Sequence, residues 1–244
     1  MGSTATAIDY PAGDGVTVCK GVYYTPESIR GEKPSGRPVV LVTHAWDGLV
    51  DEIHDKARRL AELGYIAFAI DVYGNGKTET DLSKLMDTLG PYMENRALLL
   101  ERMQAAVTAA KTLPGADAGR IGAIGYCFGG TAVLDLARGS NDVRAVVSFH
   151  GGLPGNGLQQ SDAITARVLV LHGDDDPLVP QEQVAEFRRE MKTRGADWTL
   201  VAYGNTMHGF TRPGANNPDF GNLYSPVADA RSWRAMQDFF SETL

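Results

Sequence analysis

The segment Gly125-Tyr126-Cys127-Phe128-Gly129-Gly130 places a thiol between glycines at a spacing that suits nucleophilic chemistry. It follows a short apolar run at 121–124, typical of a buried strand, and it opens a stretch with helical periodicity. A sharp strand-to-helix turn strains its central residue, and glycines two positions away let the backbone pass. The amides at the start of a helix also favour an anion. The sequence therefore predicts Cys127 as a nucleophile on such a turn.

A nucleophile of this kind needs a base, and the base needs an acid that orients it. His208 follows a strand-like run at 198–202, and it is the base that we expect. The acid is expected in the loop after another strand-like run, 168–171. Loops at the carboxyl ends of parallel strands are where ligand sites gather in open sheets.

Three consecutive carboxylates occupy that second loop. Asp176, which precedes Pro177, is our candidate for the acid, and Asp174 and Asp175 are its alternatives. A metal site made by the three carboxylates is not favoured, because no His or Glu stands at ligand spacing from them.

When the thiol attacks a substrate carbonyl, the carbonyl oxygen becomes an oxyanion, which needs backbone N–H donors. The N–H of Phe128, which follows the nucleophile, is one candidate. The second is the N–H of Trp46, in the loop after the strand-like run 39–43. His150 and His172 end two other predicted strands, and we expect them to bond locally to the backbone. Cys19 is expected to be structural.

The elements that must position these residues alternate between buried strands and amphipathic helices from about residue 37 onward. This order predicts an α/β fold with a mostly parallel, doubly wound sheet of about eight strands and helices on both faces. The first 35 residues alternate in polarity, with Val16, Val18 and Tyr24 on one face, and predict antiparallel edge strands. Nothing resembles a linker or an inserted cap, so the whole chain, 1–244, is predicted to be one domain. A loop at 72–94 is expected to wall the pocket.

Composition narrows the function. The 244 residues are 43% apolar and carry a net charge of −7, which argues against binding to nucleic acid or to an anionic membrane. The first residues show no basic cluster and no apolar stretch, so we expect no signal peptide, and no apolar run is long enough to span a bilayer. Two cysteines are consistent with a reducing compartment, so we expect a cytoplasmic protein that is a monomer or a small homo-oligomer.

The motifs together resemble the dienelactone hydrolase family of the α/β-hydrolases. The resemblance rests on the Cys127 turn, the Asp176-Pro turn and His208-Gly-Phe, and on two further segments, Asp71-Val-Tyr-Gly and Phe149-His-Gly-Gly. It implies a Cys–His–Asp triad of Cys127, His208 and Asp176, no cofactor, no metal, and hydrolysis of lactones or small carboxylic esters.

The resemblance also implies a role for Arg212, because an arginine at this place in the family binds a substrate carboxylate. A guanidinium beside the site of an acidic protein can indeed hold an anion through two hydrogen bonds. The chain departs from the family at Ala45, where the family carries a Glu that engages the resting thiol. Two alternatives follow: a small-acyl-binding protein that senses redox state through Cys127 without turnover, and, less favoured, a cysteine peptidase.

Overall fold

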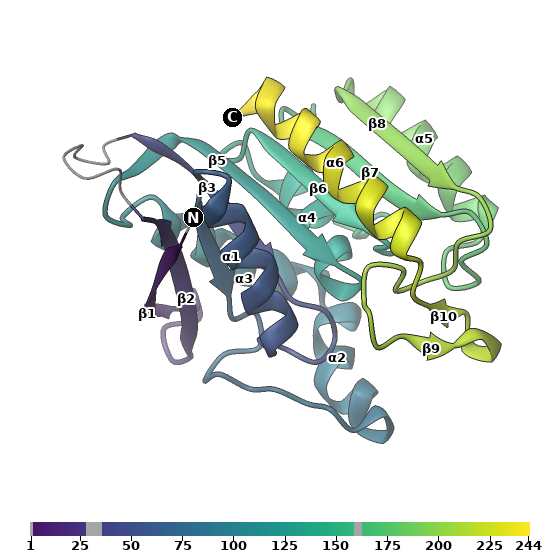
Figure 1. The fold of residues 1–244 in the computed structure, drawn as a ribbon, viewed down its shortest axis with the longest axis horizontal. Helices are drawn as coiled ribbons and strands as arrows, with labels where there is room; N and C mark the ends of the chain where they lie inside the picture. Colours follow the sequence, from purple (N-terminus) through teal and green to yellow (C-terminus); the bar gives the residue numbers. More distant parts are fainter. Residues whose placement is uncertain (1, 28–35, 159–162) are drawn as a thin grey trace. The chain divides into compact units, whose positions relative to one another are not determined.

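The computed structural model describes residues 2–27, 36–158 and 163–244 (Figure 1). The chain divides into two compact units, 1–123 and 124–244, and the boundary falls within strand β5 (Ala116–Tyr126). Within the described part of the chain, no helix has both the length and the apolar character that a membrane-spanning segment requires.

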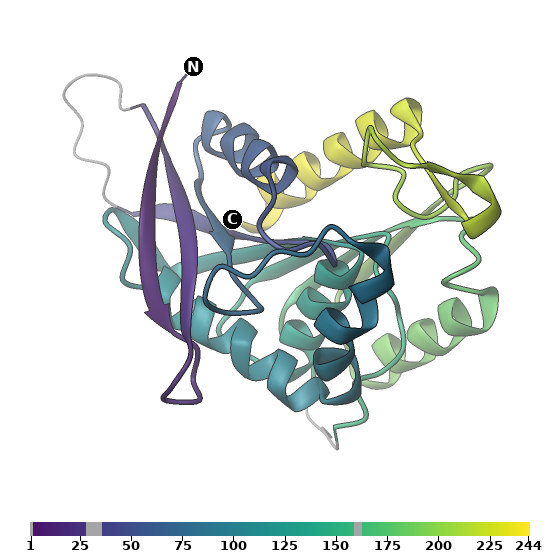
Figure 2. The same ribbon diagram turned by 90° about the horizontal axis from the view of Figure 1, so that it is seen from below.

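The strands of the first unit are hydrogen-bonded in the order β1-β2-β4-β3-β5. They are β1 (Ser3–Pro11), β2 (Val18–Pro26), β3 (Arg37–Thr43) and β4 (Ile66–Ile70), followed by β5. β1 pairs with β2, and β2 with β4, in antiparallel fashion, whereas β3 and β4 are parallel. The predicted antiparallel pair at the N-terminus is therefore confirmed (Figure 2).

The helices of the first unit are α1 (Asp51–Glu62), the 3-10 turn η1 (Leu82–Lys84), α2 (Leu85–Glu94) and α3 (Arg96–Ala110). α1 buries one face, which includes Ile53, Ala57 and Leu60, and it is followed by Gly64 at φ +103°. Figure 2 shows α1 and α3 on opposite sides of the strands. The prediction of a loop over 72–94 is wrong for its second half, because η1 and α2 occupy 82–94.

The expected inner face of β2 is wrong for the first half of the strand, although Tyr24, on that face, is buried. Val16 and Val18 are 87% and 41% exposed, whereas Cys19 is fully buried. The buried face of β2 instead includes Gly21, because a Cβ there would lie 2.6 Å from the ring of Phe68. The alternation of apolar and polar residues predicted the strand. It did not show which face is buried, because Gly21 on the buried face has no apolar side chain.

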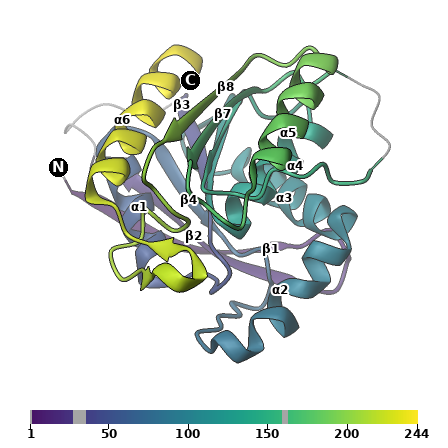
Figure 3. The same ribbon diagram turned by 90° about the vertical axis from the view of Figure 1, so that its right-hand side faces the viewer.

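The second unit continues the strand order as β5-β6-β7-β8, with β6 (Ala145–Phe149), β7 (Arg167–Gly173) and β8 (Trp198–Tyr203) parallel to one another. Its helices are α4 (Phe128–Gly139), α5 (Gln181–Thr193) and α6 (Pro226–Thr243). Figure 3 shows α6 on one face of these strands and α4 and α5 on the other. The predicted α/β fold, a mostly parallel sheet of eight strands with helices on both faces, is confirmed.

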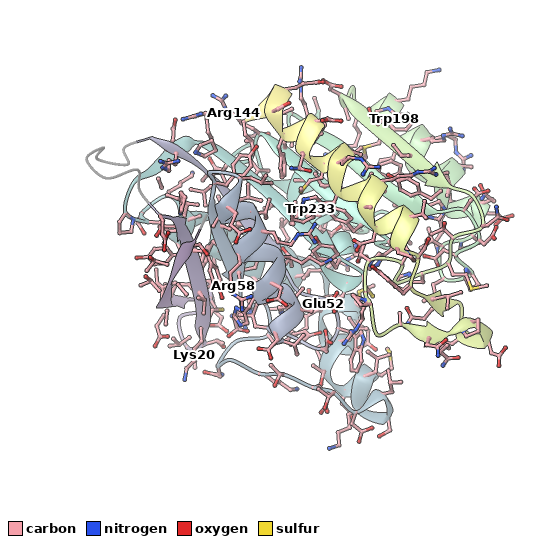
Figure 4. All side chains as sticks on the ribbon, in the orientation of Figure 1. Lys20, Glu52, Arg58, Arg144, Trp198 and Trp233 are labelled. Atoms are coloured by element: carbon pink, nitrogen blue, oxygen red, sulfur yellow. The ribbon has the colours of Figure 1, made fainter. Side chains whose placement is uncertain are left out.

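Two sets of contacts fix the helices of the second unit. The guanidinium of Arg138 in α4 is buried and bonds both Asp135, at 3.2 Å, and Glu190 of α5, at 2.8 Å. Trp198, labelled in Figure 4, packs its ring edge-on against Phe187 of α5. A small hairpin, β9 (Asn216–Asn217) and β10 (Asn222–Leu223), lies between β8 and α6 in the chain, with the 3-10 turn η2 (Pro218–Phe220) between its strands.

Candidate active site

Cys127 lies between the end of β5 and the first residue of α4, at φ +53° and ψ −113°. This is a strained conformation for a residue with a side chain. Its N–H donates to Phe149 O at 3.0 Å, and its own carbonyl accepts the N–H of Thr131. A Cβ on Gly125 would collide with the backbone of Gly129. The sharp turn that the sequence predicts is therefore present, and its thiol is partly exposed.

The acidic loop after β7 separates its three carboxylates clearly. Asp176 is 3% exposed, and its Oδ2 accepts a hydrogen bond from Nδ1 of His208 at 2.8 Å. Its Oδ1 accepts the N–H of Leu178 at 2.9 Å. Asp174 and Asp175 are exposed, and Asp174 bonds Gln181 instead. Of the three candidates, only Asp176 contacts the histidine.

His208 is buried, and its backbone is held from both sides. Its N–H donates to Gly221 O at 2.8 Å, and its carbonyl accepts the N–H of Leu223 at 3.0 Å. Among the described residues, Nε2 has no well-aligned hydrogen-bond partner. Burial opposes a charged ring, but the nearby charge of Cys127 and the hydrogen bond to Asp176 raise the pKa of His208 to about 10. The ring is thus a cation at neutral pH when the sulfur is an anion.

The two thiols of the chain have different environments. Cys19 is fully buried in β2, and its burial raises the pKa of the thiol to about 11. It cannot supply a thiolate at neutral pH, in accord with the structural role expected for it. Cys127, by contrast, stands at a helix N-terminus beside an imidazole whose other side faces a buried carboxylate.

His150 is a site neighbour that sequence reasoning missed. It follows β6 at φ +40°, and its ring packs edge-on against the ring of His208, with centroids 5.0 Å apart. Its Nε2 shares a hydrogen bond with Thr211 Oγ1 at 2.8 Å, so the expectation of a purely backbone partner is wrong. The signal was available: β6 lies beside β7, so a histidine that ends β6 emerges next to the acid and base loops.

His172 also departs from expectation. It is 2% exposed, and neither ring nitrogen has a hydrogen-bond partner within the described ranges. Burial lowers the pKa of this histidine, which keeps the ring neutral.

Phe128 is the first residue of α4, so its N–H belongs to the helix-terminal amides that have no acceptor inside the helix. Trp46 lies in the first unit, in the loop after β3. The carbonyl of Trp46 accepts a hydrogen bond from Tyr73 Oη at 2.7 Å, and His44 Nε2 accepts the N–H of Val72 at 3.2 Å. These contacts anchor the loop, while the role of the Trp46 N–H as a donor to the oxyanion stays a prediction.

Arg212 lies in the segment that connects β8 to α6, four residues after His208. Its N–H donates to Gly209 O at 2.9 Å, and its side chain is partly exposed. Its contact with a substrate carboxylate stays a prediction. Among the described residues, no three His, Cys, Asp or Glu side chains gather in a way that could hold a metal ion.

Comparison with known proteins adds independent findings. Residues 21–244 match the sequence model of the dienelactone hydrolase family. A Bradyrhizobium protein named "Probable 2-oxo-3-(5-oxofuran-2-ylidene)propanoate lactonase" is 30% identical over 207 residues, which cover 80% of this chain and 80% of that protein.

Two solved structures are similar over the full chain. The first is a dienelactone hydrolase-like promiscuous phosphotriesterase from metagenomic libraries, with 38% identity and a TM-score of 0.92, covering 100% of this chain and 99% of that one. The second, named m3DLH, has 36% identity and a TM-score of 0.92, and the match covers 100% of both chains.

Proposed function

The chain belongs to the dienelactone hydrolase family, as its motifs predict, and we propose that it hydrolyses lactones or small carboxylic esters through Cys127, His208 and Asp176. The observation that carries the proposal is the buried hydrogen bond of 2.8 Å from His208 to Asp176, on a ring whose pKa the charge of Cys127 helps to raise. In the reactive form of the site, His208 has taken the proton of Cys127, which gives a thiolate beside an imidazolium. Such a pair forms without a further carboxylate, which is consistent with Ala45 in place of the family Glu.

In the first half-reaction, the Cys127 sulfur attacks the carbonyl carbon. A C–S bond forms, and the carbonyl oxygen becomes an oxyanion. The N–H groups of Phe128 and Trp46 are the donors that we assign to this oxyanion, and each such donor contributes on the order of 3 kcal/mol. The C–O bond to the leaving alcohol then breaks, and the imidazolium of His208 gives its Nε2 proton to the departing oxygen.

In the second half-reaction, the neutral ring of His208 takes a proton from water. The hydroxide adds to the thioester carbonyl, the C–S bond breaks, and the thiolate and imidazolium are restored. Asp176 stays ionised throughout, holding the Nδ1–H and balancing the charge of the ring. For a lactone substrate, the leaving alcohol and the product acid remain in one molecule.

The test is hydrolysis of an activated ester and of a simple lactone by Cys127→Ala. We expect turnover to fall to the background rate. Cys19→Ala is the matched control, because it also removes a thiol, and it should retain turnover in proportion to its folded fraction. Near wild-type turnover by Cys127→Ala would remove Cys127 from the chemistry.

The substrate class that we propose carries a carboxylate held by Arg212. A screen of lactones and linear esters, each with and without a free carboxylate, tests this preference in wild type and in Arg212→Ala. We expect Arg212→Ala to lose the preference and Arg234→Ala, which removes an exposed arginine of α6, to keep it. An unchanged preference in Arg212→Ala would retire the assignment.

The likeness to a promiscuous phosphotriesterase adds one arm to that screen. A thiolate can attack the phosphorus of a phosphotriester as it attacks an acyl carbon, so an aryl phosphotriester should be a slower substrate of the same site. Cys127→Ala should lose both activities together.

The redox alternative uses the partial exposure of Cys127. Its test is brief peroxide treatment followed by mass mapping. Reversible oxidation of Cys127 in a protein that hydrolyses none of the acyl substrates would favour sensing over turnover. We also propose a cytoplasmic monomer or small homo-oligomer acting as one domain, for which light scattering and fractionation are the direct measurements.

A further inference from the structure

The hairpin β9–β10 folds back onto the base, although it lies beyond His208 in the chain (Figure 1). β10 forms a parallel bridge between Asn222 and His208. The two hydrogen bonds described above, to Gly221 O and from Leu223 N–H, fix the backbone of His208 at both its donor and its acceptor. The position of the base is therefore determined by this hairpin as well as by β8.

Gly221 also contacts the acid loop. It adopts φ +79°, and a Cβ at this position would lie 2.5 Å from Pro177 Cδ and closer still to Cγ. Pro177 directly follows Asp176, and the N–H of the next residue, Leu178, donates to Asp176 Oδ1 at 2.9 Å. A push on the Pro177 ring thus moves the turn that orients the carboxylate. Only a hydrogen fits between the two segments.

Asn222 contacts the residue that follows the base. A Cβ on Gly209, which adopts φ +64°, would collide with Oδ1 of Asn222. Two adjacent residues of the hairpin therefore contact both loops: Gly221 contacts Pro177, which follows the acid, and Asn222 contacts Gly209, which follows the base. The two loops also meet directly at Gly173, where a Cβ would lie 2.5 Å from Thr206 O, so the hairpin adds a second connection on the side of Pro177 and Gly209.

We propose that Gly221 and Asn222 are positioning residues that hold His208 and Asp176 in register. This clamp does not touch the substrate. It acts by fixing the distance from Nδ1 to Oδ2, which is 2.8 Å, and through it the aim of Nε2 toward the sulfur. The proposal rests on the proposed function for its kinetic consequences, but not for its effect on the histidine itself.

The central variant is Gly221→Ala, compared with two glycine controls. Gly195 also adopts a positive φ, +63°, but has open space around it, so Gly195→Ala reproduces the backbone strain without the collision. Gly214 lies in the same connecting segment as Gly221 with nothing within 4 Å and no positive φ, so Gly214→Ala controls for the added methyl group.

We expect Gly221→Ala to lower kcat at least 10-fold with KM changed less than about 3-fold, because misplacing a catalytic group by about 1 Å can cost 100-fold in rate. The pKa of His208, followed by NMR, should fall as the carboxylate moves away. Both control variants should keep kcat and the pKa of His208 near wild-type values.

The most specific test is whether a second substitution restores the activity of Gly221→Ala. Pro177→Ala removes the ring atoms that the new methyl group would strike. In the Gly221→Ala background it should therefore restore most of kcat and of the His208 pKa, although alone it improves neither. A merely structural role for Gly221 predicts a lower melting temperature without this specific recovery.

The proposal is overturned if Gly221→Ala behaves like Gly195→Ala in kcat and in His208 titration, or if Pro177→Ala rescues neither. If Gly221→Ala does not fold, Asn222→Ala carries the test. It should lower kcat several-fold together with the His208 pKa, and wild-type values in both would refute the clamp. The NMR titration does not depend on turnover. If Cys127→Ala proved active and the hydrolase proposal failed, the effect of Gly221→Ala on the pKa of His208 could still be measured.

Discussion

Replacing Asp176 by Asn is the change that most directly tests the site. Asn preserves the shape of the side chain and can still meet Nδ1 of His208, but it carries no charge and can present its amide N–H₂ to the ring. The bond it replaces is 2.8 Å long, and the exposures of the two side chains are 10% for His208 and 0% for Asp176. Water therefore screens the interaction weakly.

The magnitude follows from this geometry. Two unit charges attract by about 6 kcal/mol at the length of this bond and by about 4 kcal/mol at a separation of about 4 Å, at an effective dielectric of about 20. The imidazolium that loses this support is the state that protonates the leaving group. At about 1.4 kcal/mol per factor of ten, we expect kcat to fall by about 10³- to 10⁴-fold. The pKa of His208 should fall too, since the bond to Asp176 is one of the influences that raise it.

The assay is steady-state hydrolysis of an activated ester, combined with NMR titration of His208. Asp174→Asn and Asp175→Asn are matched controls, because each makes the same chemical change in an exposed side chain of the same loop. Both should remain within about threefold of wild type. If Asp176→Asn keeps kcat within tenfold, or if Asp175→Asn loses as much, the acid has been assigned wrongly.

Three further outcomes are expected. In Cys127→Ala the pKa of His208 should fall, because the charge of Cys127 is the strongest influence that raises it, so NMR should find the ring losing its proton at a lower pH than in wild type; an unchanged titration would contradict the ion pair. Gly125→Ala should lower the free energy of unfolding in urea by about 3 kcal/mol, since its methyl group meets the backbone of Gly129, and a wild-type midpoint would refute this packing. Arg138→Met should lower it by about 3–5 kcal/mol, because the buried carboxylate of Asp135 loses the guanidinium that balances its charge, with kcat per folded molecule unchanged; a loss below 1 kcal/mol would show that the pair contributes little.

Local features of the sequence were enough to predict much of this protein. Short apolar runs and helical periodicity identify the strands and helices, because burial on two faces or one stripe leaves a pattern in neighbouring residues. Ser225 before Pro226 predicts the start of α6, and the Ser225 hydroxyl does accept the N–H of Ala228. The nucleophile turn is equally local, since the glycines that permit it stand within four residues of Cys127.

What the sequence could not decide depends on contacts between distant segments. Three aspartates in a row look alike until β7 and β8 are placed side by side, and only then does Asp176 meet His208. His150 is an ordinary strand-end residue until β6 brings its ring against that of His208. The need for glycine at position 221 comes from its contact with Pro177, more than forty positions earlier in the chain. Residue type and spacing determine which chemistry is available, whereas the packing of separate loops determines which of several equivalent groups performs it.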